Sequence, residues 1–376
     1  MKKISLAVSA ALLFASNTMA ADNIVVGVEK SYVPYFNELA KEFNKGKDFK
    51  VNVEAASMFD LLSALPTQKG NIADVFMIPN DRIGELADQY LITSTNFTNT
   101  GFTDAATNAA TYNGQTYMVP MSTDTTLFLY NKDMVKEVPN TLKEIPASDW
   151  AAKFTDFYFT GGLFMSNGGY IFKDNNPQDI GLNTAGSIKA GLAAQGLYHS
   201  GVSHWTLMQD DTVANDIMMK YFMEGKLKAI VHGPWAIADI EKAGINVGAA
   251  PIPSWDGSYP YKALTGTKGM AVNGYSDNKE GARAFIKFVA TPENALKWYE
   301  MTREVSPSLS VNYVEGSLHK AIFDATNIGQ PMPNISEFMK VWGPMKTALA
   351  QIAQGQNVKA ALDAAVDTIE IDIEDM

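Results

Sequence analysis

The sequence has 376 residues, contains no cysteine and carries a formal net charge of −11 at pH 7. A chain of this length more often forms two domains than one, and its hydrophobic content of 46% is ample for a buried core. The absence of cysteine excludes disulfides, thiolate metal sites and a cysteine nucleophile. The acidic balance disfavours nucleic-acid binding, which usually requires a basic face.

Residues 1–20 have the pattern of a secretory signal peptide. A basic start, Met1-Lys2-Lys3, precedes an apolar run over residues 4–15, and Thr18-Met19-Ala20 supplies small residues before a cleavage point. The run is too short to span a bilayer, which takes roughly 20 apolar residues. We therefore expect Sec-dependent secretion and cleavage after Ala20. Because no cysteine follows to carry a lipid, we expect a free chain in the periplasm of a bacterium with two membranes.

Apolar strand patterns then alternate with helical ones. We expect strands over 24–28, 49–53 and 73–78, separated by helices over 35–45 and 58–65. This alternation predicts βαβ units and a parallel sheet. In open α/β sheets, ligands lie beyond the carboxyl ends of the strands. Those ends carry two polar clusters, Glu29-Lys30-Ser31 and Pro79-Asn80-Asp81-Arg82.

A second α/β region follows, and its elements are again read from apolar spacing. The expected helices cover 185–197, 213–224, 235–243, 279–290 and 292–299, and the expected strands cover 228–231, 246–249 and 269–273. The C-terminal part is typical of helix, with Gly343-Pro344 forcing a kink or break. No internal repeat or low-complexity linker is present, so two domains would be built by the chain crossing between them.

Motifs for a metal, a nucleotide or a nucleophilic serine are absent. The pairs Gly161-Gly162 and Gly168-Gly169 lack the spacing of a phosphate cradle, and the four histidines are scattered. We therefore expect no cofactor, no metal site and no enzyme. A Ser/His/Asp set or a carboxylate pair for glycoside hydrolysis stays open, because such residues meet in space rather than in sequence.

Three segments contain aromatic residues that are candidate ligand contacts. Tyr158 lies in Asp156-Phe157-Tyr158-Phe159, Trp235 follows His232-Gly233-Pro234, and Trp342 follows Met332-Pro333-Asn334-Ile335 by a short helical stretch. Aromatic faces flank sugars well, because sugar C–H surfaces are apolar and weakly positive while the ring face is negative. From composition alone, a place in the core is the simpler interpretation of these rings.

At these residues the chain resembles the periplasmic maltose/maltodextrin-binding proteins, family 1 solute-binding proteins of ABC importers. The similarity covers nearly the whole mature chain in segments, and several segments in the family's order are more specific than any single one. The matching segments are Leu129-Tyr130-Asn131-Lys132-Asp133, the stretch 158–170, Phe222-Met223-Glu224-Gly225, Gly233-Pro234-Trp235-Ala236, and Met332-Pro333-Asn334-Ile335 with Trp342.

The resemblance implies the type II periplasmic-binding-protein fold, an α/β fold of two hinged lobes, each with a mostly parallel sheet flanked by helices. By analogy, the N-lobe covers 21–122 and 270–311, the C-lobe covers 127–264 and 318–376, and the hinge crossovers are 123–126, 265–269 and 312–317. The implied partners are maltose or maltodextrin and a membrane-embedded ABC permease with a cytoplasmic ATPase. The family is usually monomeric.

The resemblance also implies a set of ligand-binding residues. Charged groups in that set exchange hydrogen bonds with sugar hydroxyls, while aromatic faces bury the apolar sides of the sugar. The charged positions are Glu29, Lys30, Asp81, Arg82, Asp124, Asp156 and Lys346, and the stacking positions are Tyr158, Trp235 and Trp342.

The chain departs from the family pattern at three positions. Ile78 replaces an N-lobe tryptophan, Ile237 replaces the aromatic after Gly-Pro-Trp-Ala, and Asn80 replaces a common histidine. One stacking platform is therefore weakened, and the ligand stays open between maltodextrin of some length, a cyclic glucan and another α-glucoside.

Two further hypotheses remain. A polyamine ligand would use a carboxylate-rich cleft, although the aromatics and the neighbouring Lys30 and Arg82 favour neutral polyhydroxyl ligands. A periplasmic hydrolase of α-glucans would instead use Asp124 or Asp156 for turnover.

Overall fold

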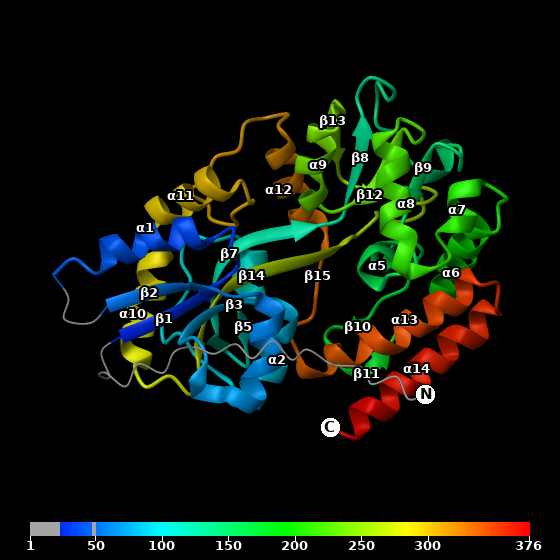
Figure 1. Cartoon of the computed structure of the whole chain (residues 1–376). Coiled ribbons are helices and arrows are strands. Elements are labelled where there is room, and N and C mark those ends of the chain that lie inside the picture. Colours follow the sequence, from blue (N-terminus) through cyan, green and yellow to red (C-terminus); the bar gives the residue numbers. More distant parts are fainter. Residues whose placement is uncertain (1–22, 47–49) are drawn as a thin grey trace, which may run out of the picture.

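The computed structural model describes residues 23–46 and 50–376, and the predicted signal peptide, residues 1–20, lies outside them. The described chain forms two α/β lobes, each with its own sheet, joined through the long strands β7 (Met118–Thr125) and β14 (Leu264–Asn273) (Figure 1). Across these two ranges, no helix has the length and apolarity needed to cross a membrane.

The N-lobe is built on a seven-stranded mixed sheet with a parallel centre. β1 (Asn23–Val28) lies between β2 (Lys50–Ala55) and β3 (Val75–Pro79) and runs parallel to both, as the strand–helix alternation predicts. β3 is buried over nearly its whole length, which is typical of a strand covered on both faces. β14 then pairs antiparallel with β3, β4 (Ile92–Thr93) and β7, and parallel with β15 (Gln330–Pro331).

Amphipathic helices cover this sheet. The helix α1 buries Tyr35, Phe36, Leu39, Ala40 and Phe43 at helical spacing, and the rings of Tyr35 and Phe36 meet the indole of Trp298 in the N-lobe core. The N-lobe helices are α1 (Val33–Phe43), α2 (Met58–Gln68), α3 (Ile83–Asp88), α4 (Asp104–Ala109), α10 (Lys279–Val289) and α11 (Pro292–Thr302), and a small hairpin is formed by β5 (Thr111–Tyr112) and β6 (Gln115–Thr116).

The C-lobe sheet has three strands that point the same way and one, β8 (Leu127–Asn131), that runs against them. Its strand order is β13 (Val247–Ala250), β8, β12 (Ala229–His232), β9 (Trp150–Ala152), and only β12 and β9 pair in parallel. β8 follows β7 directly out of the crossover and inserts between two strands that run the other way. β14 plays the same part in the N-lobe, where β14 and its parallel neighbour β15 run against the other five strands of the sheet.

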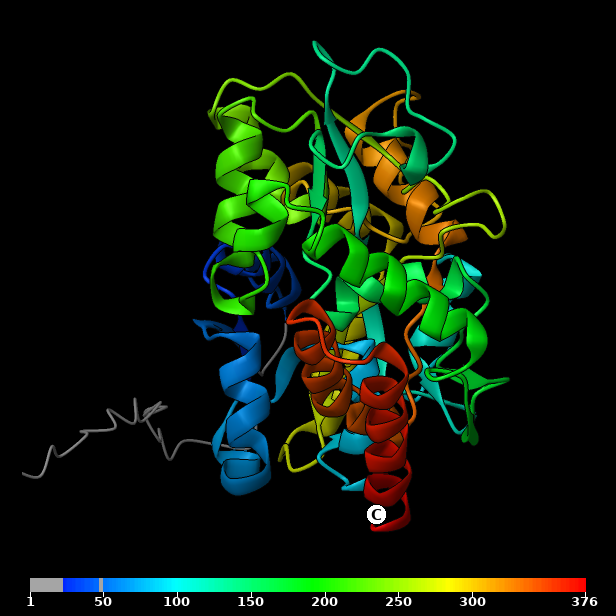
Figure 2. The same ribbon diagram turned by 90° about the vertical axis from the view of Figure 1, so that its right-hand side faces the viewer.

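Helices surround the C-lobe sheet, and α13 and α14 pack side by side at the C-terminus (Figure 2). The predicted kink or break at Gly343-Pro344 is not a break, because α13 continues through Pro344 and loses only the hydrogen bond that proline cannot donate. The C-lobe elements are α5 (Phe157–Met165), β10 (Phe172–Lys173), β11 (Asn176–Ile180), α6 (Ala185–Tyr198), α7 (Ser203–Leu207), α8 (Asp211–Met223), α9 (Ile237–Lys242), α12 (Leu318–Ile328), α13 (Met339–Ala353) and α14 (Val358–Glu374).

Three chain segments run together where the lobes meet. β7 pairs with β14 along most of its length, and the Thr123 amide donates to the Val305 carbonyl at 2.9 Å. The register of the β7–β14 ladder shifts between Lys268 and Gly269, which marks a β-bulge in the crossover. Bulges turn side chains in new directions and are common beside functional sites.

The Asn80 side chain hydrogen-bonds the end of β3 to two other segments of the chain. Its amide nitrogen donates to the Met332 carbonyl and its amide oxygen accepts from the Thr267 amide, each at 2.9 Å. The Asn80 side chain is fully buried, so no water replaces these bonds if the side chain is removed. One residue thus holds β3, β14 and the segment after β15 in register.

We expect Asn80→Ala to lower the free energy of unfolding by about 2–4 kcal/mol, because it leaves a buried N–H and a buried C=O without partners. Denaturant unfolding measures the change. Asn246→Ala is the matched control, since Asn246 is exposed and donates only to Asp133, and it should change stability by less than about 0.5 kcal/mol. Equal stability of wild type and Asn80→Ala would contradict the structural role.

Candidate functional site

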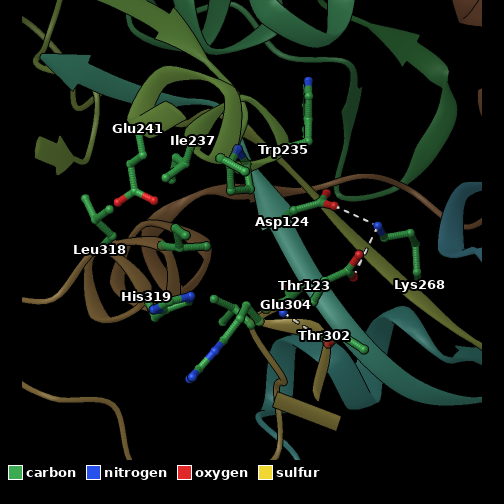
Figure 3. Close-up of a pocket in the computed structure, with 15 residues that line it drawn as sticks. Thr123, Asp124, Trp235, Ile237, Glu241, Lys268, Thr302, Glu304, Leu318 and His319 are labelled. Carbon is green, nitrogen blue, oxygen red and sulfur yellow. Dashed lines mark hydrogen bonds and ion pairs between the residues drawn. The ribbon is translucent and has the colours of Figure 1, made fainter. Parts of the chain in front are cut away.

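A cavity of about 510 Å³ lies between the C-lobe helices α9 and α12 and the crossover strands (Figure 3). Its walls include Asp124 from β7, Lys268 from β14, Trp235 and Ile237 around the start of α9, and Glu304 from the segment that follows α11. Its volume lies within the usual range of small-molecule sites, about 300–1,000 Å³. Two of the residues predicted from sequence, Asp124 and Trp235, therefore line one cavity.

A lysine between two carboxylates forms the polar edge of this cavity. Lys268 Nζ lies 3.3 Å from Asp124 Oδ2 and 3.5 Å from Glu304 Oε2, and Figure 3 shows the three side chains converging. Burial alone would lower the pKa of Lys268, but the two carboxylates outweigh it and hold that pKa above its usual value. The lysine is therefore charged at physiological pH and fixes the orientation of both acidic groups.

Two tyrosines extend this arrangement into both lobes. The Tyr158 hydroxyl, on α5 of the C-lobe, donates to Asp124 Oδ1 at 3.4 Å, and the Tyr32 hydroxyl, before α1 of the N-lobe, donates to Glu304. Burial is the main cause that raises the pKa of each tyrosine, so both keep their protons and act as donors. We call Tyr32, Glu304, Lys268, Asp124 and Tyr158 the crossover network.

Trp235 presents an aromatic face beside this network. Its side chain is 53% exposed, and its ring centroid lies 6.2 Å from that of Tyr158. A Cβ on Gly233 would fall 2.1 Å from the indole, so glycine is required there for the ring to fold back over its own backbone. An exposed, rigidly held indole next to a second ring is well suited to stack on a ligand.

Asp81 and Trp342 bring the two lobes together at a second point. Asp81 follows β3 in the N-lobe, and Trp342 lies on α13 of the C-lobe. Burial raises the pKa of Asp81 to about 6, while Arg82 and a hydrogen bond from Trp342 oppose that rise. Arg82 itself pairs with Glu85 at 2.7 Å.

Asp156 and Lys346 belong to a chain of charges at the start of α5. Asp156 Oδ1 accepts from the Tyr158 amide at 2.9 Å, so it caps α5 and fixes the position of Tyr158. Lys153 lies 3.4 Å from Asp156 and 3.0 Å from Asp211, which also pairs with Lys346 at 3.7 Å. Lys346 is 70% exposed, so its charge is largely solvated in this structure.

Glu29 and Lys30 lie just after β1, as predicted, but the structure gives Glu29 a local partner. Glu29 Oε1 accepts from the Met58 amide at 2.8 Å and so holds the first turn of α2. Lys30 is exposed.

The two isoleucines that depart from the family pattern have different environments. Ile78 is fully buried in the N-lobe core, so it offers no face to a ligand. Ile237 is half-buried and lines the cavity (Figure 3).

Tyr32, Lys268 and Glu304 are not among the site residues predicted from sequence. The sequence does distinguish Lys268, since it is the one charged residue in the otherwise uncharged run of β14. Nothing in the sequence indicates Tyr32 or Glu304, because tertiary contacts alone bring these two residues to the cavity. In residues 23–46 and 50–376, no group of three or more His, Asp or Glu side chains is placed to hold a metal ion.

Comparisons with known proteins agree on one family. Residues 38–319 match the family of bacterial extracellular solute-binding proteins. The maltodextrin-binding protein MdxE of Bacillus subtilis is 30% identical over 94% of this chain and 90% of its own length.

Solved structures of the same kind superpose closely on this chain. The maltose-binding periplasmic protein of Listeria monocytogenes, in complex with maltose, has a TM-score of 0.83 and 31% identity, covering 94% of this chain and 98% of that one. MalX of Streptococcus pneumoniae, in complex with maltopentaose, has a TM-score of 0.83 and 30% identity, covering 93% and 100% of the two chains.

The raised pKa of Asp81 predicts a pH-dependent stability difference between wild type and Asp81→Asn. The folded state holds the Asp81 proton up to a pKa of about 6, whereas the unfolded state releases it near the ordinary aspartate pKa of 3.8. Wild type should therefore gain about 2–3 kcal/mol relative to Asp81→Asn as the pH falls from 7 to 4. Denaturant unfolding at both pH values measures this gain. A difference that does not change with pH would place Asp81 in a solvated setting.

Proposed function

The chain belongs to the bacterial extracellular solute-binding proteins, and we propose that it captures maltose or maltodextrin-type α-glucosides between its two lobes. In this proposal Asp81, Asp124, Tyr158, Trp235 and Trp342 bind the ligand. The supporting observation is that carboxylates and aromatic rings from both lobes meet: Asp81 with Trp342, and Asp124 with Tyr158 and Trp235. Sugars need this combination, because their edges carry hydroxyls and their faces are apolar.

The proposed ligand-binding set also includes residues that support the main contacts, namely Glu29, Lys30, Arg82, Asp156 and Lys346. Glu29 and Asp156 fix α2 and α5 next to the ligand while keeping acceptor capacity on their carboxylates. Lys30 and Lys346 are exposed, so closure of the lobes on a ligand is needed to bring them into contact.

The transport role follows from closure. A ligand that touches both lobes only in the closed form shifts the population towards that form. Domain closure of this kind is general for periplasmic binding proteins. We propose that a monomeric chain, released into the periplasm after cleavage at Ala20, delivers the closed form to a membrane permease with a cytoplasmic ATPase and catalyses no reaction itself.

The proposed lobe boundaries are those drawn from the sequence, with crossovers at 123–126, 265–269 and 312–317. The separation of the two apolar cores supports them, because Leu264 packs in the C-lobe core while Met270, Ala271 and Val272 pack in the N-lobe core.

A polyamine ligand is the weaker alternative. Its ammonium groups would seek the free carboxylates of the cleft, but Asp124 already faces Lys268, whose positive charge repels a cationic ligand. The aromatic faces of Trp235 and Trp342 suit a neutral polyhydroxyl ligand as well.

Calorimetric titration of maltotriose into protein unfolded and refolded to strip bound ligand tests the proposal. We expect saturable binding with micromolar or tighter affinity and no heat with glucose or spermidine. Saturable binding of spermidine alone would overturn the sugar assignment. Release of shorter sugars from maltodextrin on long incubation would indicate a hydrolase, and Asp124→Asn and Asp156→Asn would then abolish turnover.

We expect Trp235→Ala and Trp342→Ala each to weaken maltotriose binding by about 1–3 kcal/mol, the scale of losing a buried aromatic contact. Tyr90→Gly is the control, because Tyr90 is 79% exposed and its φ of 56° suits glycine. Titration with all three variants measures the change, and unchanged affinity in both tryptophan variants would exclude stacking.

A further inference from the structure

The turn that carries Trp235 begins at a buried histidine. His232 is the last residue of β12, and its side chain is only 2% exposed. A short turn, Pro234–Ala236, follows directly, and the Ala236 amide closes it by donating to the Gly233 carbonyl at 3.2 Å. The backbone between His232 and Ala236 therefore decides where the exposed indole of Trp235 lies.

Hydrogen bonds at both ring nitrogens fix the imidazole of His232. Its Nδ1 lies 2.8 Å from the Gly233 amide, which can only donate, so Nδ1 is an acceptor; the Gly233 carbonyl lies farther away, at 3.3 Å. Nε2 therefore carries the hydrogen and donates to Asn215 Oδ1, on α8, at 2.8 Å. Burial lowers the pKa of His232 to about 4, so the ring is neutral at pH 7. His232 thus ties the backbone ahead of Trp235 to α8.

The same imidazole also packs directly against the indole. The ring centroids of His232 and Trp235 lie 5.7 Å apart with their planes at 65°. Phe159, on α5, lies 5.8 Å from His232 and 6.5 Å from Trp235, edge to face in both pairs. Edge-to-face contact at these distances is a favoured aromatic arrangement. The indole is therefore held by neighbouring rings while about half of its surface stays exposed.

We propose that His232 is a positioning residue for ligand binding: its imidazole fixes the orientation of the Trp235 indole on which the ligand stacks. The inference rests on the proposed function, because it concerns the same stacking contact. A ring that is already held in one orientation loses little side-chain freedom when the ligand binds, so less of the stacking energy is lost to ordering. An indole that turned freely at the same place would bind the same ligand more weakly.

Four variants separate positioning from packing. His232→Leu fills the space but removes both hydrogen bonds, whereas His232→Asn keeps an acceptor, because Oδ1 of asparagine stands where Nδ1 stands and reaches the Gly233 amide. Asn215→Ala removes the partner of Nε2 at an exposed helix position, so it keeps the test open if His232→Leu does not fold. His204→Leu is the matched control, since His204 is also buried in the C-lobe, bonds the Trp150 carbonyl and is not among the residues that line the cavity.

Each variant is made in wild type and in Trp235→Ala, folding is checked by denaturant unfolding, and maltotriose is titrated at pH 7. His232→Leu should weaken binding by about 3–30-fold and Asn215→Ala by about 2–5-fold, each a part of the loss expected for Trp235→Ala. His232→Asn should recover most of the affinity, and His204→Leu should stay within about 2-fold of wild type. In the Trp235→Ala background, His232→Leu should cause no further loss, because a positioning residue acts only through the ring that it holds.

Three results would overturn the positioning role. They are wild-type affinity in both His232→Leu and Asn215→Ala, a loss in His232→Leu that persists undiminished in the Trp235→Ala background, and an equal loss in His204→Leu. Any of these leaves the proposed function intact as long as wild type binds maltotriose. Failure of wild type to bind maltotriose would overturn the proposed function itself, and the positioning role with it.

Discussion

The placement of Lys268 between Asp124 and Glu304 is the interaction on which the centre of this molecule depends. Strands that join two lobes need apolar residues for packing and polar residues for contact with a ligand. A lone charge in such a strand would be costly to bury. The bulge at Lys268 and Gly269 turns the lysine towards two carboxylates from different chain segments. The charges compensate one another, and Tyr32 and Tyr158 carry the hydrogen-bonded arrangement into the two lobes.

This arrangement also explains why the cleft suits ligands without charge. Each carboxylate of the crossover network already has a cation or a hydroxyl donor, so a neutral hydroxyl finds oriented acceptors without bringing an unpaired charge into the cleft. Rigid aromatic faces then supply apolar contact area. In the proposed function, a ligand that bridges Asp81 of the N-lobe and Trp235 of the C-lobe gains contacts in the closed form alone, and this differential affinity would drive closure.

Local pattern was enough to predict β1, β2, β3, α1, α2, α10 and α11 of the N-lobe, because residues such as Tyr35, Phe36 and Leu39 repeat at helical spacing and bury one face. It did not predict β7, α3 or α4. It also did not predict the reversed strand β8. The crossover sets the direction of β8, and the residues of the strand itself do not indicate that direction. It also missed the continuity of α13 through Pro344, since tertiary packing of Val341 and Met345 outweighs one lost hydrogen bond. At the site, segment resemblance led to Asp124, Tyr158 and Trp235, whereas Glu304 and Tyr32 became visible only once three distant segments met.

The interleaving of the chain has a consequence for how the protein is made. β14 is a central strand of the N-lobe sheet, yet it is synthesised after all four strands of the C-lobe sheet, and Trp298 completes the N-lobe core later still. Residues 23–122 alone therefore lack the strand that bridges β3 and β7 and cannot form a closed core. The first lobe in sequence is among the last to be completed, and its loop closures are long, which slows folding relative to a chain whose lobes are consecutive.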